Sequence, residues 1–242
     1  MKNNRFPLKY SFWPLVLFLM AVLLAFWPRY FSQLGEAPIN PHFHAHGVTM
    51  TLWCLLLILQ PILIRYNYRK LHRILGYFSY LLVPLIFYSI IDLLLFRFNG
   101  IPALGSFHLY FVALVVNSAV AFLLVYGLAI YFRKKVHLHA RFMIVTVFTI
   151  LTPVTDRLTY RFAPEWVQMV PVIDGAPIVQ VIGFVIADAI LLTLILSDWL
   201  SGRKPYAFGA ALGIMLFMQY TIMNFYKFDF WRSFAEWLLG VV

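Results

Sequence analysis

The sequence predicts an all-α, polytopic membrane protein with seven transmembrane helices, its N-terminus inside and its C-terminus outside. Three observations lead to this fold class. First, 63% of the 242 residues are hydrophobic and only 12% are charged, whereas a soluble domain keeps about a quarter of its residues charged. Second, the mean hydropathy of +0.84 arises from apolar runs that match the thickness of a bilayer. Third, basic residues gather in alternate loops. These observations exclude a water-soluble domain.

The apolar runs form one integral membrane domain over residues 1–242, with connections too short for a sizeable extramembrane domain. The first run follows basic residues but lacks a signal-peptide cleavage site, so we expect an uncleaved helix. Spans two to five make up a histidine-bearing four-helix unit, residues 40–160. The seven predicted spans are residues 12–27, 46–64, 74–96, 107–132, 142–160, 178–196 and 207–226.

The distribution of Lys and Arg predicts the orientation, because cytoplasmic loops of membrane proteins are enriched in both. With the N-terminus inside, thirteen of the 19 Lys and Arg residues fall on the inner side and the other six on the outer side. This bias explains the formal charge of +10, so we expect the lipid bilayer, and no nucleic acid, as a partner. We expect a multi-pass protein of the bacterial inner membrane. The single cysteine, Cys54, excludes an intramolecular disulfide.

Two segments are expected on the outer side, beyond the spans. Residues 228–239 place charged and aromatic side chains in a helical pattern, which predicts a short helix lying in the membrane interface. Residues 161–177 form the longest outer connection. This connection either covers an outward-facing site or is an interfacial loop.

The seven histidines are the strongest chemical signal, and all of them fall at the predicted ends of spans two to five. A histidine at a span end, taken alone, is more often a helix cap or an interfacial residue. The concentration of all seven on four consecutive spans favours a role as ligands. The outer set contains His42, His44, His46 and His108, and the inner set contains His72, His137 and His139.

The start of span two has a local signal of its own. Asn40 followed by Pro41 predicts a helix N-cap, so His42 should already be helical. His42 and His46 then share one face, while His44 points elsewhere. Two histidines four residues apart on a helix can bind one metal ion, and His108 is the candidate third ligand of such an outer site for zinc, copper or iron.

Three sequence runs carry a resemblance to known proteins. The runs HFHAHGVTMTLWCLLLILQ, KLHRILGYFSYLLVP and HLHARFM, with Arg157 one span later, resemble a group of poorly characterised bacterial multi-pass membrane proteins with an HR-x-LG signature. The histidine layout over residues 40–160 is also similar to that of the di-haem transmembrane cytochromes b of the ascorbate-reductase and hydrogenase-subunit kind.

This resemblance implies two haem b groups held between helices. It assigns His44 or His46 with His108 to an outer haem, and His72 with His137 or His139 to an inner haem. The histidines of such cytochromes lie a turn or more inside the bilayer, whereas here the two sets are separated by about 28 Å of helix. Either the helices project beyond the bilayer, or only one set binds haem, or the histidines bind a smaller metal.

Three acidic residues are candidates to orient the histidine rings by accepting a hydrogen bond: Asp92, Asp156 and Asp188. Asp188 lies near the middle of span six, where a charged carboxylate costs roughly 2.5 to 3.5 kcal/mol on insertion scales. That cost is consistent with a proton relay, with a counter-ion to a histidine ligand, or with a carboxyl group bonded to a neighbouring helix.

Three hypotheses for the function follow. The first is a redox protein that binds haem b or another redox metal through both histidine sets and uses a quinone-like or other lipid-soluble substrate and an electron-transfer partner. Such a protein belongs to electron transport or to the oxidoreductases. The second is a non-haem metalloenzyme with a single outer site at His42, His46 and His108. The third is a proton-coupled transporter that uses Asp188, or a structural subunit of a membrane complex.

Overall fold

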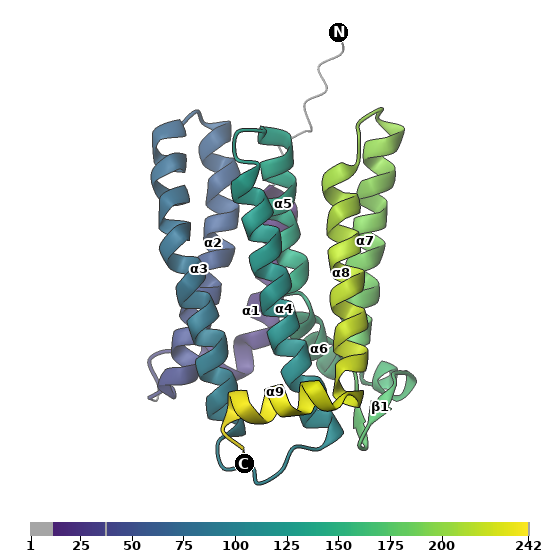
Figure 1. The fold of residues 1–242 in the computed structure, drawn as a ribbon. Helices are drawn as coiled ribbons and strands as arrows, with labels where there is room; N and C mark the ends of the chain where they lie inside the picture. Colours follow the sequence, from purple (N-terminus) through teal and green to yellow (C-terminus); the bar gives the residue numbers. More distant parts are fainter. Residues whose placement is uncertain (1–11, 37, 242) are drawn as a thin grey trace. The chain divides into compact units, whose positions relative to one another are not determined.

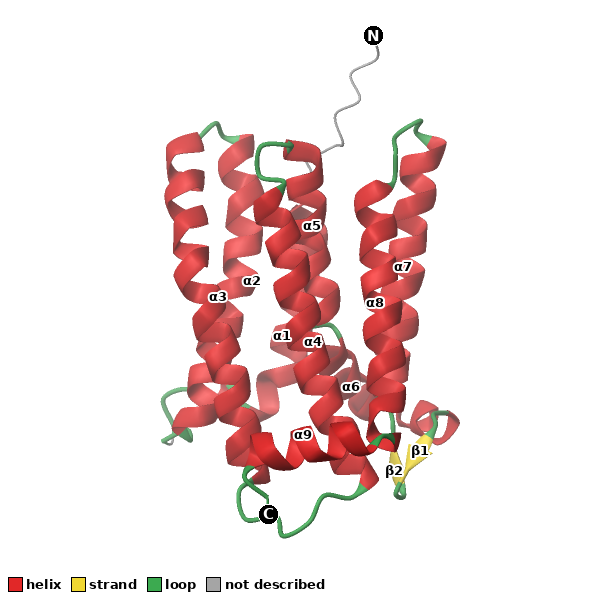
Figure 2. Ribbon diagram, viewed as in Figure 1, coloured by secondary structure: helices red, strands yellow, loops and turns green. Residues whose placement is uncertain are grey.

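The computed structural model describes residues 12–36 and 38–241, which are almost entirely helical (Figure 1, Figure 2). The only strands among these residues are β1 (Val172–Ile173) and β2 (Ala176–Pro177), which form a short antiparallel hairpin. The chain divides into two compact units, residues 1–96 and residues 97–242, named unit 1 and unit 2 below.

Six of the described helices are long and apolar enough to cross a membrane. A bent pair, α5 (Val136–Thr149) and α6 (Thr152–Phe162), provides a seventh crossing if the two helices count as one span. The all-α polytopic fold is therefore confirmed, and the protein is an integral, multi-pass membrane protein. The six are α1 (Phe12–Phe26) with the turn that continues it to Arg29, α2 (Pro41–Arg65), α3 (Arg69–Phe98), α4 (Ser106–Tyr131), α7 (Gln180–Leu200) and α8 (Tyr206–Asn224) with the turn that continues it to Lys227.

Unit 1 contains α1, α2 and all but the end of α3. Two short 3-10 helices, η2 (Trp27–Arg29) and η3 (Phe31–Gln33), connect α1 to α2. Between them, the ring of Tyr30 packs directly on Gly47, where any Cβ atom would collide with it. Glycine at this position therefore allows the connection to lie against α2.

Unit 2 contains α4, α5, α7 and α8 as neighbouring helices, with α9 (Asp229–Leu239) lying across the ends of α4 and α8 after η5 (Phe225–Lys227) (Figure 1). The helix predicted over residues 228–239 is thus confirmed. The Trp231 indole N–H donates to the Leu109 carbonyl (3.0 Å), and the Arg232 guanidinium donates to the Leu104 carbonyl (2.8 Å). These two bonds attach α9 to the beginning of α4.

The segment predicted as one span over residues 142–160 is instead two helices with a bend of 46° between them. Pro153 stands in the first turn of α6 and has no N–H to continue the hydrogen-bond ladder of α5. Nearby, the hydroxyl of Thr149 donates to the carbonyl of Thr146, which also favours a bend. The break therefore has a local cause in the sequence.

The connection at residues 161–177 contains η4 (Pro164–Met169) and the β1–β2 hairpin. Asp174, in the turn of the hairpin, has a positive φ of 48°, which Asp tolerates better than most residues. Its carboxylate accepts a hydrogen bond from the Phe107 backbone N–H (3.0 Å) in the first turn of α4. A carboxylate is favourable at a helix N-terminus, so this connection caps α4.

A buried ion cluster joins α5 to the end of α7. The guanidinium of Arg141 donates to Asp198 Oδ1 (2.8 Å), and their side chains are only 4% and 1% exposed. Arg203 donates to the same oxygen (2.8 Å), and Arg141 also lies over the ring of Phe208 in α8, 5.5 Å from its centroid. Three helices of unit 2 therefore meet at Arg141.

Removing one partner of this buried pair should destabilise unit 2. We expect Arg141→Ala to lower the free energy of unfolding by about 3 to 5 kcal/mol, because Asp198 keeps a buried charge with only Arg203 beside it. The measurement is reversible denaturation in detergent, followed by helical circular dichroism.

The matched control is the double variant Arg141→Met/Asp198→Leu, which removes both charges and keeps the volume. Such replacements of a whole buried pair are often neutral, so this variant should be much more stable than Arg141→Ala. Equal stability of wild type and Arg141→Ala would show that the cluster does not hold the helices together.

Candidate functional site

The first two turns of α2 hold the three histidines of the predicted outer set that belong to unit 1. Asn40 caps the helix, since its Oδ1 accepts the His42 backbone N–H (3.0 Å), and this confirms the predicted cap. His42 and His46 both bond to side chains of α3, whereas His44 bonds to Tyr30. The predicted division of these rings between two faces is also confirmed.

His42 forms the shortest polar contact of this cluster. Its Nδ1 lies 2.6 Å from Oδ2 of Asp92, and the two side chains are 38% and 25% exposed. The ring of Phe96 stacks on the imidazole with 4.4 Å between centroids. Because a carboxylate oxygen only accepts, the proton of this bond belongs to Nδ1, and Nε2 is the atom left for a ligand.

His46 is oriented in the same way by a hydroxyl group. Its Nδ1 lies 3.2 Å from Ser89 Oγ, and that hydroxyl donates its single proton to the Ile86 carbonyl (2.8 Å). With the Ser89 proton in that bond, the imidazole is the donor and carries its own proton on Nδ1. Thr49 contacts the same Ser89 hydroxyl (3.1 Å), so Ser89 links one face of α2 to α3.

His44 contacts the connection between α1 and α2. Its Nδ1 lies 3.2 Å from the hydroxyl of Tyr30. The Tyr30 residue as a whole is only 8% exposed. Burial raises the pKa of the Tyr30 phenol above its ordinary value, so the phenol stays protonated at neutral pH. A protonated Tyr30 can donate to Nδ1 or accept from it, and both proton positions of His44 are compatible with the contact.

Two other histidines use Nδ1 in the opposite way, as an acceptor. His108 accepts the backbone N–H of Gly105 at Nδ1 (3.2 Å) and thereby caps the start of α4. His72 lies at the start of α3, beside Gln60 of α2. With the Gln60 amide oriented so that its oxygen accepts the Gly76 N–H (3.2 Å), its nitrogen donates to Nδ1 of His72. A neutral imidazole that accepts at Nδ1 carries its proton on Nε2. Ligation through Nε2 would therefore require this proton to move and the accepted bond to break.

The last two histidines lie in the first turn of α5 and have different surroundings. Nδ1 of His139 donates to the Ala129 carbonyl in α4 (2.8 Å), which again leaves Nε2 for a ligand. His137 is exposed, and its ring makes no hydrogen bond within the part of the chain that the structure describes. Of this inner pair, His139 is therefore the oriented ring.

The three acids singled out in the sequence have separate partners. Asp92 orients His42, as described above. Asp156 in α6 accepts from the Gln180 amide (2.5 Å), whose oxygen in turn accepts from the hydroxyl of Tyr110 (3.1 Å). Asp188 in α7 accepts from the Gln219 amide of α8 (3.0 Å). Within residues 12–36 and 38–241, neither Asp156 nor Asp188 bonds to a histidine.

The predicted ligands fall in both units. His42, His44, His46 and His72 belong to unit 1, and His108, His137 and His139 belong to unit 2. In the described residues, no group of three or more His, Cys, Asp or Glu side chains is arranged to hold a metal ion. The assignment of any histidine as a ligand stays a prediction.

Sequence reasoning named Asp92, which bonds to His42, but it missed Ser89 and Tyr30. Ser89 lies three residues before Asp92, so helical spacing places both on one face of α3 and allows both to be paired with His42 and His46. Tyr30 lies outside the predicted spans and carries no motif. Comparison with known proteins adds no further candidate, because no family model, curated protein or solved structure matches the chain.

The hydrogen bonds predict which ring nitrogen carries the proton in each histidine. At alkaline pH, where free imidazole is neutral, we expect the proton on Nδ1 in His42, His46 and His139 and on Nε2 in His72 and His108. Nitrogen-15 NMR of histidine-labelled protein measures this directly, with single His→Gln variants to assign each signal. A proton on Nε2 of His46 or on Nδ1 of His108 would contradict the hydrogen bonds described above.

Proposed function

We propose that this protein is a redox protein of the bacterial inner membrane that binds haem b through its histidines. The observation that carries the proposal is the orientation of His42, His46 and His139, each of which holds its Nδ1 against an oxygen atom. Histidines that bind a metal almost always donate their other ring N–H to a carboxylate, carbonyl or similar acceptor. The same arrangement at both predicted ends of the spans supports ligand sets at both ends.

Haem fits these rings because it needs only one or two axial imidazoles from the protein. A bound haem b would supply one-electron transfer. The rings contribute a basic Nε2, and Asp92, Ser89 and the Ala129 carbonyl keep each ring in one orientation and increase its basicity.

The orientation also ranks the candidate ligands. At the predicted outer end, His46 is the leading ligand. Of the three histidines of α2, it lies farthest from the start of the helix, and its hydrogen bond to Ser89 places its proton on Nδ1. At the predicted inner end, His139 is preferred to His137. Binding of haem by His108 or His72 would require that ring to give up the hydrogen bond that its Nδ1 accepts. The proposed partners are a lipid-soluble substrate such as a quinone and an electron-transfer protein.

A second candidate function is a non-haem metal site for zinc, copper or iron. Of its three predicted ligands, His42 and His46 share one face of α2 in unit 1, and His108 belongs to unit 2. The short contact between His42 and Asp92 favours this candidate, since a carboxylate bonded to a ligating histidine is a common feature of such sites. An absorption spectrum together with metal analysis distinguishes the two candidates. Bound haem gives an iron porphyrin spectrum, whereas a non-haem site gives bound metal without that spectrum.

Haem titration of the purified, haem-free protein tests the proposal. We expect a Soret band that sharpens and shifts to a six-coordinate position as haemin is added to saturation. His46→Ala should abolish binding at the outer position, and Ser89→Ala should weaken it by about 10- to 100-fold, because the ring loses the group that orients it.

Two alanine variants in the first turn of α5 test the inner position, one as the test variant and the other as its matched control. His139→Ala should weaken haem binding at the inner position, whereas His137→Ala should leave it unchanged, since the described residues offer the His137 ring no hydrogen-bond partner. Full binding in both His46→Ala and His139→Ala would overturn the proposal.

A further inference from the structure

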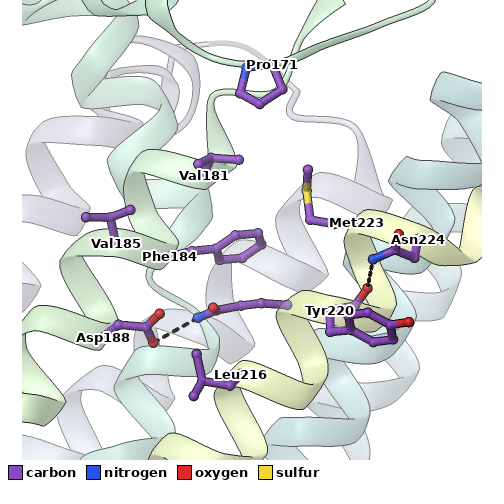
Figure 3. A pocket seen from close by; sticks show the side chains of 10 residues that line it. Pro171, Val181, Phe184, Val185, Asp188, Leu216, Tyr220, Met223 and Asn224 are labelled. Atoms are coloured by element: carbon purple, nitrogen blue, oxygen red, sulfur yellow. Dashed lines mark hydrogen bonds between the residues drawn. The ribbon is translucent and has the colours of Figure 1, made fainter.

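A groove runs along the seam between α7 and α8 in unit 2 (Figure 3). The groove has a volume of about 390 Å³. It extends from Asp188, near the middle of α7, to Pro171, in the connection that precedes α7. Figure 3 shows Phe184 and Asp188 of α7 on the side of Leu216 in α8, and Tyr220 of α8 also lines the groove. The walls are mostly apolar, as expected for a site that takes a membrane-soluble molecule.

Asp188 and Gln219 line the groove and are bonded to each other across the seam between α7 and α8. The Gln219 amide donates to Oδ1 of Asp188 (3.0 Å), and this is the bond drawn between the two helices in Figure 3. Oδ2 of Asp188 and Oε1 of Gln219 make no hydrogen bond within residues 12–36 and 38–241. Two oxygen acceptors, one of them on a carboxyl group, therefore border an apolar groove at a depth where lipid supplies no donor.

Two aromatic residues also line the groove. Phe184 is one turn before Asp188 on the same face of α7, and Tyr220 follows Gln219 in α8. The faces of aromatic rings attract organic cations, and this attraction is stronger where water is excluded. A carboxyl group with aromatic neighbours in an apolar groove is the combination that recognises a substituted ammonium or phosphonium ion.

We propose that the groove between α7 and α8 is a binding site for a lipophilic organic cation, whose charge lies beside Asp188 and whose apolar groups contact Phe184, Leu216 and Tyr220. A cation complements the carboxylate in charge, and its apolar groups complement the groove walls. The volume suits a ligand of the size of a small drug molecule. The site involves none of the histidines, so it stands or falls independently of haem binding.

The test uses two probes of nearly the same shape that differ in charge. Methyltriphenylphosphonium is the cation, and 1,1,1-triphenylethane is its neutral counterpart. Binding is measured by equilibrium dialysis against the full-length protein in nanodiscs of neutral phosphatidylcholine, with empty nanodiscs subtracted. We expect saturable binding of the cation at one site per chain, and binding of the neutral probe that is weaker by at least about tenfold.

Two single variants locate the charge that matters. Asp188→Asn keeps the shape of the side chain and should weaken cation binding by at least about tenfold, while binding of the neutral probe stays the same. Asp229→Asn removes one negative charge from the exposed start of α9 and should change neither. Equal cation affinity in wild type and Asp188→Asn, or equal affinity for the two probes, would overturn the proposal.

A chemical measurement on the wild-type protein covers the case in which the Asp188→Asn variant does not fold. Dicyclohexylcarbodiimide modifies carboxyl groups that are reached from an apolar phase, and mass spectrometry of peptides reports the fraction of Asp188 modified. Saturating cation should slow this modification at least about tenfold, and the neutral probe should not. Modification of Asp188 at the same rate with and without the cation contradicts the proposed site.

Discussion

Polar side chains in the membrane-spanning helices must find their partners within the protein, because lipid offers neither donors nor acceptors. This constraint decides where the helices of each unit are joined. A polar group without a partner costs several kcal/mol at that depth, whereas a satisfied pair holds two helices in one register. Among the pairs that join helices in the described residues are His42 with Asp92, Asp156 with Gln180, Asp188 with Gln219, and Arg141 with Asp198.

The same constraint gives the histidines their chemistry. An imidazole at the end of a span satisfies its Nδ1 within the protein, either by donating to an oxygen acceptor or by accepting from an N–H donor. His46 and His139 belong to the first kind, and His108 and His72 belong to the second. The two kinds cannot be told apart from the residue type alone, because the difference lies in whether Nδ1 meets an acceptor or a donor.

Structural features set by residues close together in the sequence could be predicted, whereas pairings between residues far apart in the sequence could not. The cap at Asn40, the shared face of His42 and His46 and the helix α9 follow from spacing of a few residues, and all three are confirmed. The bend between α5 and α6 had a local signal in Pro153, but the apolar pattern on both sides favoured one span. The pairing of Arg141 with Asp198, 57 residues apart, depends on the packing of both α5 and α7 against α8 and carries no sequence signal.

The most direct measurement is the absorption spectrum of the full-length protein purified from the membranes in which it is made, with haem and metal content determined per chain. Ligation by the oriented histidines predicts a Soret band that shifts on reduction with dithionite, together with at least one haem b per chain. A colourless protein without stoichiometric haem or metal would contradict the account, and the histidines would then be helix caps and interhelical bonds only.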